Sequence, residues 1–158
     1  MMKPSTTEIT RLVQMALDED APWGDITSQS LIPAAARVTA DLVAREPGVL
    51  CGEDLFLAAM SLTDPAVATH FRIHDGDRFA KGDILATIEG SARGVLQAER
   101  VALNFVQRLC GIATMTAKYV AETSGTKAHI IDTERQRGRV RSDACENYAS
   151  PGVATERE

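Results

Sequence analysis

The chain lacks the features that mark several common protein classes. It has only three cysteines, Cys51, Cys110 and Cys145, and none forms a CxxC pair, so the pattern indicates neither a disulfide framework nor a zinc site. No stretch reaches the roughly 20 apolar residues of a membrane span, and residues 1–10 contain no apolar run typical of a signal peptide. We therefore expect no membrane partner and a location in the reducing cytoplasm.

Basic runs are also scarce. The formal net charge is −5 at pH 7, and no cluster of Lys and Arg precedes residue 134. Proteins that bind nucleic acid through its phosphates usually carry a basic patch, so nucleic acid is excluded as the main partner. The hydrophobic share of 44% in 158 residues is enough for the core of one ordinary domain, or of a domain plus a fragment.

Residues 94–124 form the longest periodic stretch of the sequence. Apolar residues recur there at the i, i+3, i+4, i+7 spacing of one helix face, so we predict a long helix. Gly111 lies in its middle, where glycine costs about 1 kcal/mol relative to alanine. We interpret Gly111 as a break or kink between two helices, or as a point of close backbone approach. Arg100, on an otherwise apolar helix, is the first candidate for chemistry.

The N-terminal region predicts a shorter helix. Ser5–Glu8 has the hydroxyl and glutamate spacing of a capping box. The acidic run at 18–20 is expected just beyond the last turn, because like charges there oppose the helix dipole, and Pro22 prevents continuation. In the loop that follows, Trp23 is expected to bury its ring, and Asp25 is a candidate cap for a short turn.

Residues 37–88 predict short strands around one helix. Charged and apolar residues alternate along 37–45, which indicates a half-exposed strand. Two Gly turns separate further short strands, and we expect them to pair as hairpins in a small antiparallel sheet or half-barrel. The expected elements are strands at 37–45, 49–52, 71–73, 78–79 and 84–88 and a helix at 54–62. The helix face of Ala102, Phe105, Leu109 and Ile112 is expected to pack on this sheet.

The last part of the chain changes character. Residues 128–133 predict one more buried strand, whereas residues 134–158 contain no Leu, Ile or Phe. Such a composition is typical of a loop or disordered tail. A shifted reading frame and true divergence would both produce this abrupt change, and the sequence leaves the two open.

Four motifs resemble one enzyme family, the quinolinate phosphoribosyltransferases. The matching pieces, over about residues 8–133, are LDEDAPWGDITS, VAREPGVLCG, HDGDRFAKGDILATIEG and AERVALNFVQRLCGIATMTAKYV. The resemblance implies an α+β fold: the N-terminal α/β open-sandwich domain (hammerhead or barrel-sandwich-like) of a type II phosphoribosyltransferase, with a long kinked helix leading to the first strand of a truncated α/β barrel. The expected division is 1–114 for this domain, 115–133 for the start of the barrel and 134–158 for an irregular tail.

The same resemblance implies an activity. Enzymes of this family join quinolinate to phosphoribosyl pyrophosphate and release pyrophosphate and CO₂, giving nicotinate mononucleotide for NAD biosynthesis. Mg²⁺ accompanies the pyrophosphate in the family, and we identify no ligand for it in this chain. A homodimer or higher oligomer is expected. Because most of the barrel is missing, we expect the chain to be a fragment with little or no activity alone.

Substrate-binding residues also follow from the resemblance. Arg100, in AER, corresponds to an arginine that reaches across the dimer into the neighbouring quinolinate pocket, and Arg binds carboxylates bidentately. Thr133 belongs to the family's Asp-Thr-Arg-Lys-Thr motif. Here Glu134 replaces the motif's Arg and Arg135 its Lys, and a one-residue slip does not restore the motif. We therefore name Arg100, Thr133 and Arg135 as substrate-binding candidates, with no catalytic residue and no metal ligand.

Two non-enzymatic interpretations remain open. The chain could be a dimerisation or binding module that pairs with a full-length paralogue and lends it Arg100. The two Gly turns also resemble those of barrel-sandwich carrier domains, whose turns present a modifiable lysine. Lys81 lies in such a turn, although Ala80 and Gly82 beside it are not the usual flanking residues, and a solvated turn residue is the simpler interpretation.

Overall fold

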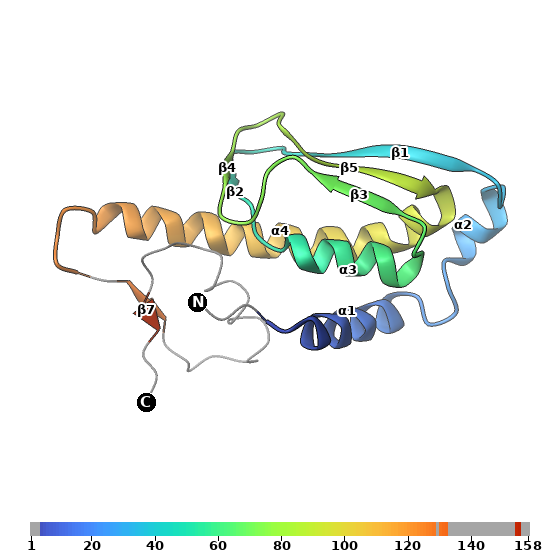
Figure 1. Ribbon diagram of the computed structural model, residues 1–158, viewed down its shortest axis with the longest axis horizontal. Helices are drawn as coiled ribbons and strands as arrows, with labels where there is room; N and C mark the ends of the chain where they lie inside the picture. Colours follow the sequence, from blue (N-terminus) through green and yellow to red (C-terminus); the bar gives the residue numbers. More distant parts are fainter. Residues whose placement is uncertain (1–3, 129, 133–153, 156–158) are drawn as a thin grey trace.

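The computed structural model describes residues 4–128, 130–132 and 154–155. A three-stranded antiparallel sheet lies on one side of a pair of helices, and a further helix lies on the other side of that pair (Figure 1). The sheet order is β1-β5-β3, with the bounds Arg37–Val43, Ile84–Ser91 and Ala68–Phe71. The helix pair is α3 (Glu53–Thr63) and α4 (Ala92–Glu122), and the helix beyond it is α1 (Thr6–Asp20).

Helix α1 begins at the predicted capping box. The Ser5 hydroxyl accepts the Glu8 N–H at 3.3 Å, and the Glu8 carboxylate accepts the Ser5 N–H at 2.8 Å. The acidic run does not lie beyond the helix as predicted, since α1 continues through Asp20. Two contacts offset the unfavourable dipole interaction: Gln14 donates to Asp18 at 2.8 Å, and Asp20 pairs with Arg100.

The segment after α1 confirms one prediction and overturns another. Asp25 caps the short helix α2 (Ile26–Leu31), where its carboxylate accepts the Ser28 N–H at 3.1 Å. Trp23, by contrast, is 83% exposed, so the prediction of a buried ring is wrong. The Asp25 cap and two hydrogen bonds from Arg93 to the end of α2 hold this segment without an aromatic anchor.

The strands pair with partners that lie farther apart in the sequence than the Gly turns predict. β1 has the predicted alternation of exposed and half-buried residues. The expected hairpins are absent from the described residues, because β3 pairs with β5 and skips the strand between them. That strand, β4 (Arg78–Phe79), pairs instead with β2 (Gly48–Val49). β2 is fixed in turn to α4, where the Val49 N–H donates to the Thr114 hydroxyl at 2.9 Å.

Helix α4 is uninterrupted from Ala92 to Glu122, so the predicted break at Gly111 is wrong. Apart from the neighbouring backbone of α4 itself, no described atom lies within 4 Å of a Cβ placed there, which rules out a close approach of another described backbone segment. Leu109 and Ala113, on either side of Gly111, are both buried. Their packing stabilises the helix beyond what the glycine costs, since tertiary contacts supply most helix stability.

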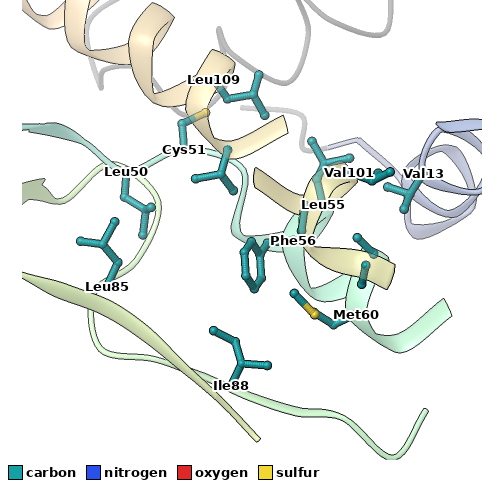
Figure 2. Packing of buried hydrophobic residues seen from close by; sticks show 14 of the residues in the cluster. Val13, Leu50, Cys51, Leu55, Phe56, Met60, Leu85, Ile88, Val101 and Leu109 are labelled. Atoms are coloured by element: carbon teal, nitrogen blue, oxygen red, sulfur yellow. The ribbon is translucent and has the colours of Figure 1, made fainter. Parts of the chain in front are cut away.

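The core lies between the sheet and the helix pair, and Figure 2 shows Phe56 at its centre, with Leu85 and Ile88 of β5 on the strand side. The Phe56 ring meets the Phe71 ring edge to face, with centroids 5.6 Å apart, an arrangement that aromatic pairs favour. α4 packs mainly against α3 rather than on the sheet. The buried residues of α4 are Gly94, Val95, Ala98, Val101, Ala102, Val106, Leu109, Ala113 and Ala117.

This list corrects the phase of the predicted helix face. Ala102 and Leu109 are buried as expected, but Phe105 is only half-buried and Ile112 is 49% exposed. The buried face of α4 therefore includes Val106 in place of Phe105, because α3 and the sheet cover different sides of the helix. None of the helices formed by the described residues combines the length and apolarity needed to cross a bilayer.

The end of the chain is described only in part. β6 (Ile131–Asp132) occupies two residues of the predicted strand 128–133 and pairs in parallel with β7 (Ala154–Thr155). Ala128 is exposed and Ile130 half-buried, so the segment is less buried than predicted. Apart from β7, the irregular tail predicted at 134–158 lies outside the described residues.

Phe56 provides a test of the core. We expect Phe56→Ala to lower the free energy of unfolding by about 3–5 kcal/mol, because its ring is 2% exposed and truncation leaves a cavity. Phe105→Ala should cost clearly less, since part of that ring is already in contact with water. Urea unfolding of the two variants and the wild type measures both values, and an equal loss for the two would contradict this description of the core.

Candidate substrate-binding site around Arg100

Arg100 lies on α4 with its head group in solvent. Its side chain is 69% exposed, and its Nη2 lies 3.2 Å from Oδ2 of Asp20, the last residue of α1. An ion pair this exposed contributes roughly 0–1 kcal/mol, so its main effect is to orient the guanidinium. A guanidinium carries five N–H donors in a planar fork, and one contact to Asp20 leaves donors for an anionic ligand.

A second carboxylate lies near this arginine. The pKa of Asp25 is lowered first by the hydrogen bond from the Ser28 hydroxyl, then by the Ser28 N–H, and further by the positive charge of Arg100. The charge of Arg100 therefore acts on two carboxylates, that of Asp20 through the ion pair and that of Asp25 at longer range. An anionic ligand of Arg100 would compete with Asp20 for the guanidinium, and the weak exposed pair makes that exchange inexpensive.

Arg93, about two turns before Arg100 on α4, has a structural role. Its Nε donates to the Ile32 carbonyl at 2.8 Å and its Nη2 to the Gln29 carbonyl at 2.9 Å. These bonds satisfy carbonyls at the end of α2, where a helix lacks intrahelical donors. They fix α2 against the start of α4. The guanidinium of Arg93 thus holds two parts of the fold together, while that of Arg100 remains exposed to solvent.

The segment held in this way has an apolar surface. Trp23, Ile26 and Leu31, which we call the α2 patch, are 83%, 64% and 74% exposed. Exposed apolar residues gathered on one segment often mark an interaction site. This patch is not predicted from the sequence, where the Trp23 ring is expected to be buried.

Of the predicted substrate-binding residues, Arg100 lies among those that the structure describes. Thr133 and Arg135 lie outside the described residues. Lys81 is exposed in the turn between β4 and β5, a turn closed by the Ala80 N–H donating to the Asp83 carboxylate at 2.7 Å. Within the described ranges there is no group of three or more His, Cys, Asp or Glu residues that could hold a metal ion.

Sequence reasoning missed a half-buried carboxylate, Asp75, which lies beside the start of α3. Gly52 caps this helix in a left-handed conformation without a side chain, and Asp75 supplies the missing acceptor to the Glu53 N–H at 3.1 Å. Burial above all raises the pKa of Asp75, to about 6; the charges of Glu53 and Asp54 act in the same direction, and the hydrogen bond from the Glu53 N–H opposes them. The only sequence signal was the Asp-Gly-Asp turn, which by itself indicates just a change of direction.

The chain resembles known proteins over the region that contains Arg100. The sequence model of the family described as "Quinolinate phosphoribosyl transferase, N-terminal domain" matches residues 25–110. The nicotinate-nucleotide pyrophosphorylase [carboxylating] of Mycobacterium leprae is 41% identical over 126 residues, which are 78% of this chain and 44% of that protein.

Solved structures agree with this match. The structure of NadC from Streptococcus pyogenes superposes with a TM-score of 0.90 at 31% identity and covers 99% of this chain and 56% of that one. The nicotinate-nucleotide pyrophosphorylase of Francisella tularensis superposes with a TM-score of 0.89 at 30% identity, covering 97% and 55%. The chain thus spans about half the length of the proteins that it resembles.

Asp75 makes the stability of the chain depend on pH. Its pKa is raised from 3.8 to about 6 in the folded protein, so folding favours the protonated form. The corresponding stability is fully present below about pH 4 and is lost as the pH rises through 6. The loss should be at most about 2–3 kcal/mol. Urea unfolding between pH 4 and 7.5 measures it.

Asp75→Asn separates this carboxylate from other groups. The amide can still accept the Glu53 N–H but cannot ionise, so we expect a flatter pH profile and higher stability at pH 7 than in the wild type. The difference between the two proteins removes the contribution of every other titratable group. Asp83→Asn, in the next turn, should keep the wild-type profile. An unchanged slope in Asp75→Asn would rule out Asp75 as the source.

Proposed function

We propose, because the chain belongs to the quinolinate phosphoribosyltransferase family, that it is the N-terminal part of an enzyme that joins quinolinate to the phosphoribosyl group of phosphoribosyl pyrophosphate. The products of this reaction are nicotinate mononucleotide, CO₂ and pyrophosphate, which places the enzyme in NAD biosynthesis. The chain spans 44% of the Mycobacterium leprae relative. The remaining half, a barrel in the family, is therefore proposed to be required for turnover.

The exposed guanidinium of Arg100 is the observation that carries this proposal. Quinolinate has two carboxylates, and a planar guanidinium can bind a carboxylate through two parallel hydrogen bonds. Asp20 holds the guanidinium at the surface at 3.2 Å, where another subunit could deliver a substrate. We propose that Arg100 contributes to the quinolinate pocket of a neighbouring subunit. Thr133 and Arg135 remain proposed substrate-binding residues.

Exposed apolar surface supports a role in assembly. Ile112, Met115 and Tyr119 recur at i, i+3 and i+7 on α4 and are 49%, 51% and 57% exposed, so they form one face. This face and the α2 patch are the surfaces through which we propose that the chain contacts another copy or the family's barrel. The proposed domain boundary near residue 114 then falls within α4, which would connect the two parts.

The metal of the reaction is proposed to come with its substrate. In the family, Mg²⁺ accompanies the pyrophosphate of phosphoribosyl pyrophosphate. The described residues of this chain contain no cluster that fits a metal. What Arg100 would supply is positioning and charge neutralisation, through which sites for anionic substrates act.

A chimaera tests both the family function and Arg100. Residues of the Mycobacterium leprae relative that match this chain are replaced by those of this chain, so that the relative's own second half completes the enzyme. We expect quinolinate-dependent formation of nicotinate mononucleotide. Arg100→Ala in the chimaera should lower kcat/KM for quinolinate by about 10–100-fold, the value of a charged hydrogen bond of about 1.5–3 kcal/mol.

Arg108 provides the matched control, because it is an exposed arginine two turns further along the same helix. Arg108→Ala should leave kcat/KM within about two-fold, while Arg100→Lys should fall between the two because lysine keeps the charge but not the fork. An inactive chimaera with correct folding would count against the family function. An active chimaera in which Arg100→Ala and Arg108→Ala behave alike would count against the site alone.

The unmodified chain should be inactive by itself. We expect no detectable nicotinate mononucleotide when the purified 158-residue chain is incubated with quinolinate, phosphoribosyl pyrophosphate and Mg²⁺. The physical reason is that the barrel, which carries most of the family's site, is absent. Liquid chromatography of the reaction mixture measures the product, with the Mycobacterium leprae enzyme as positive control. Turnover by the chain alone would contradict this expectation.

A further inference from the structure

Two cysteines from distant parts of the sequence meet in the core. The Cys51 N–H lies 3.4 Å from the Cys110 Sγ, and that sulfur lies 3.6 Å from the Cys51 carbonyl oxygen. Since an N–Cα bond is about 1.5 Å long, the Cys110 sulfur is within about 5 Å of the Cys51 Cα. Figure 2 shows the Cys51 side chain pointing toward α4, beside Leu109.

We propose that Cys51 and Cys110 form a redox-sensitive pair, which an oxidant of the peroxide class converts to an intramolecular disulfide. The sulfur of Cys110 already lies against the backbone of its partner, so bond formation requires side-chain rotation and no separation of the two segments. Disulfides join residues whose Cα atoms are roughly 4.4–6.8 Å apart, which is the range that this contact makes accessible. The inference is independent of the reaction proposed above.

The exposure of the two thiols sets the order of events. Cys51 is 0% exposed, whereas Cys110 is half-buried, so peroxide reaches Cys110 first. The Cys110 thiolate attacks a peroxide oxygen, giving a sulfenic acid and one water after proton transfer. The Cys51 thiolate then attacks the Cys110 sulfur, forming the S–S bond and releasing a second water. In total, two thiols and one hydrogen peroxide give one disulfide and two waters.

The bond would link two helices. Cys51 directly precedes Gly52, the cap of α3, and Cys110 lies in the middle of α4. Joining them closes a loop of nearly 60 residues, which restricts the unfolded chain and raises the stability of the folded one. In the reducing cytoplasm expected from the sequence, such a bond would persist only during exposure to the oxidant.

Peptide mapping tests the proposal directly. The full chain with Cys145→Ser, which removes the third thiol, is incubated for hours with hydrogen peroxide, because buried thiols react slowly. Remaining thiols are alkylated in denaturant and the protein is digested with trypsin. We expect a mass loss of about 2 Da and a reducible pair of linked peptides, 46–72 and 109–118. The melting temperature should rise by at least about 5 °C and return after reduction.

The single variants distinguish a pair from two unrelated thiols. In Cys51→Ser, the sulfenic acid at Cys110 has no resolving thiol and should be trapped by dimedone. In Cys110→Ser, both the linked peptides and the rise in melting temperature should be lost. The proposal is overturned if, in the folded Cys145→Ser protein, both thiols are recovered alkylated after peroxide, or if Cys110 proceeds to sulfinic acid while Cys51 remains a thiol.

Discussion

The close contact between α3 and α4 is the constraint on which the rest of the structure depends. At one end of α3, a Cβ on Gly52 would lie 2.8 Å from Leu109 Cδ1, and at the other, a Cβ on Gly94 would lie 2.7 Å from the Asp64 Cβ. A side chain at Gly94 would meet Asp64 close to its backbone, and one at Gly52 would meet Leu109 in a backbone conformation of φ 105° that side chains rarely adopt. Two glycines therefore allow the helices to meet at both ends of α3. The sheet packs on one side of this pair and α1 on the other.

The position of Arg100 follows from that packing. Val13 and Leu17 are buried in the shared core, which holds α1 against the helix pair and brings Asp20, at its end, to the guanidinium. Arg93 at the same time fixes α2 to the start of α4 through two backbone carbonyls. One arginine of α4 is thus used by the fold and the other is oriented in solvent, which is the difference between a structural residue and a candidate ligand-binding residue.

Local chemistry explains what the sequence could predict. The capping box at Ser5, the cap at Asp25 and the alternation along β1 depend on near neighbours, and all three are confirmed. The predictions of hairpins, of a buried Trp23 and of a break at Gly111 were wrong. The structure has instead a pairing of β3 with β5, an exposed Trp23 and a continuous α4, and all three depend on distant contacts. Arg100 was singled out as a charge on an otherwise apolar helix, and the family motif gave it a substrate-binding role. Its partner Asp20 could not be found in this way, because only the tertiary structure brings the end of α1 to this part of α4.

The exposure of Arg100 also shows why the proposed site needs a second surface. In water, a guanidinium and a carboxylate attract each other by only about 1 kcal/mol at 4 Å, and several times more strongly where the effective dielectric is lower. At 69% exposure Arg100 is in the first situation and would bind quinolinate weakly. A covering surface that excludes water changes this, and apolar residues around the arginine favour such contact. The α2 patch, whose Trp23 lies two residues before Asp25, supplies apolar surface on the segment next to Arg100. The proposed role of Arg100 therefore requires assembly with the part of the family's fold that the chain, at about half its relatives' length, does not itself contain.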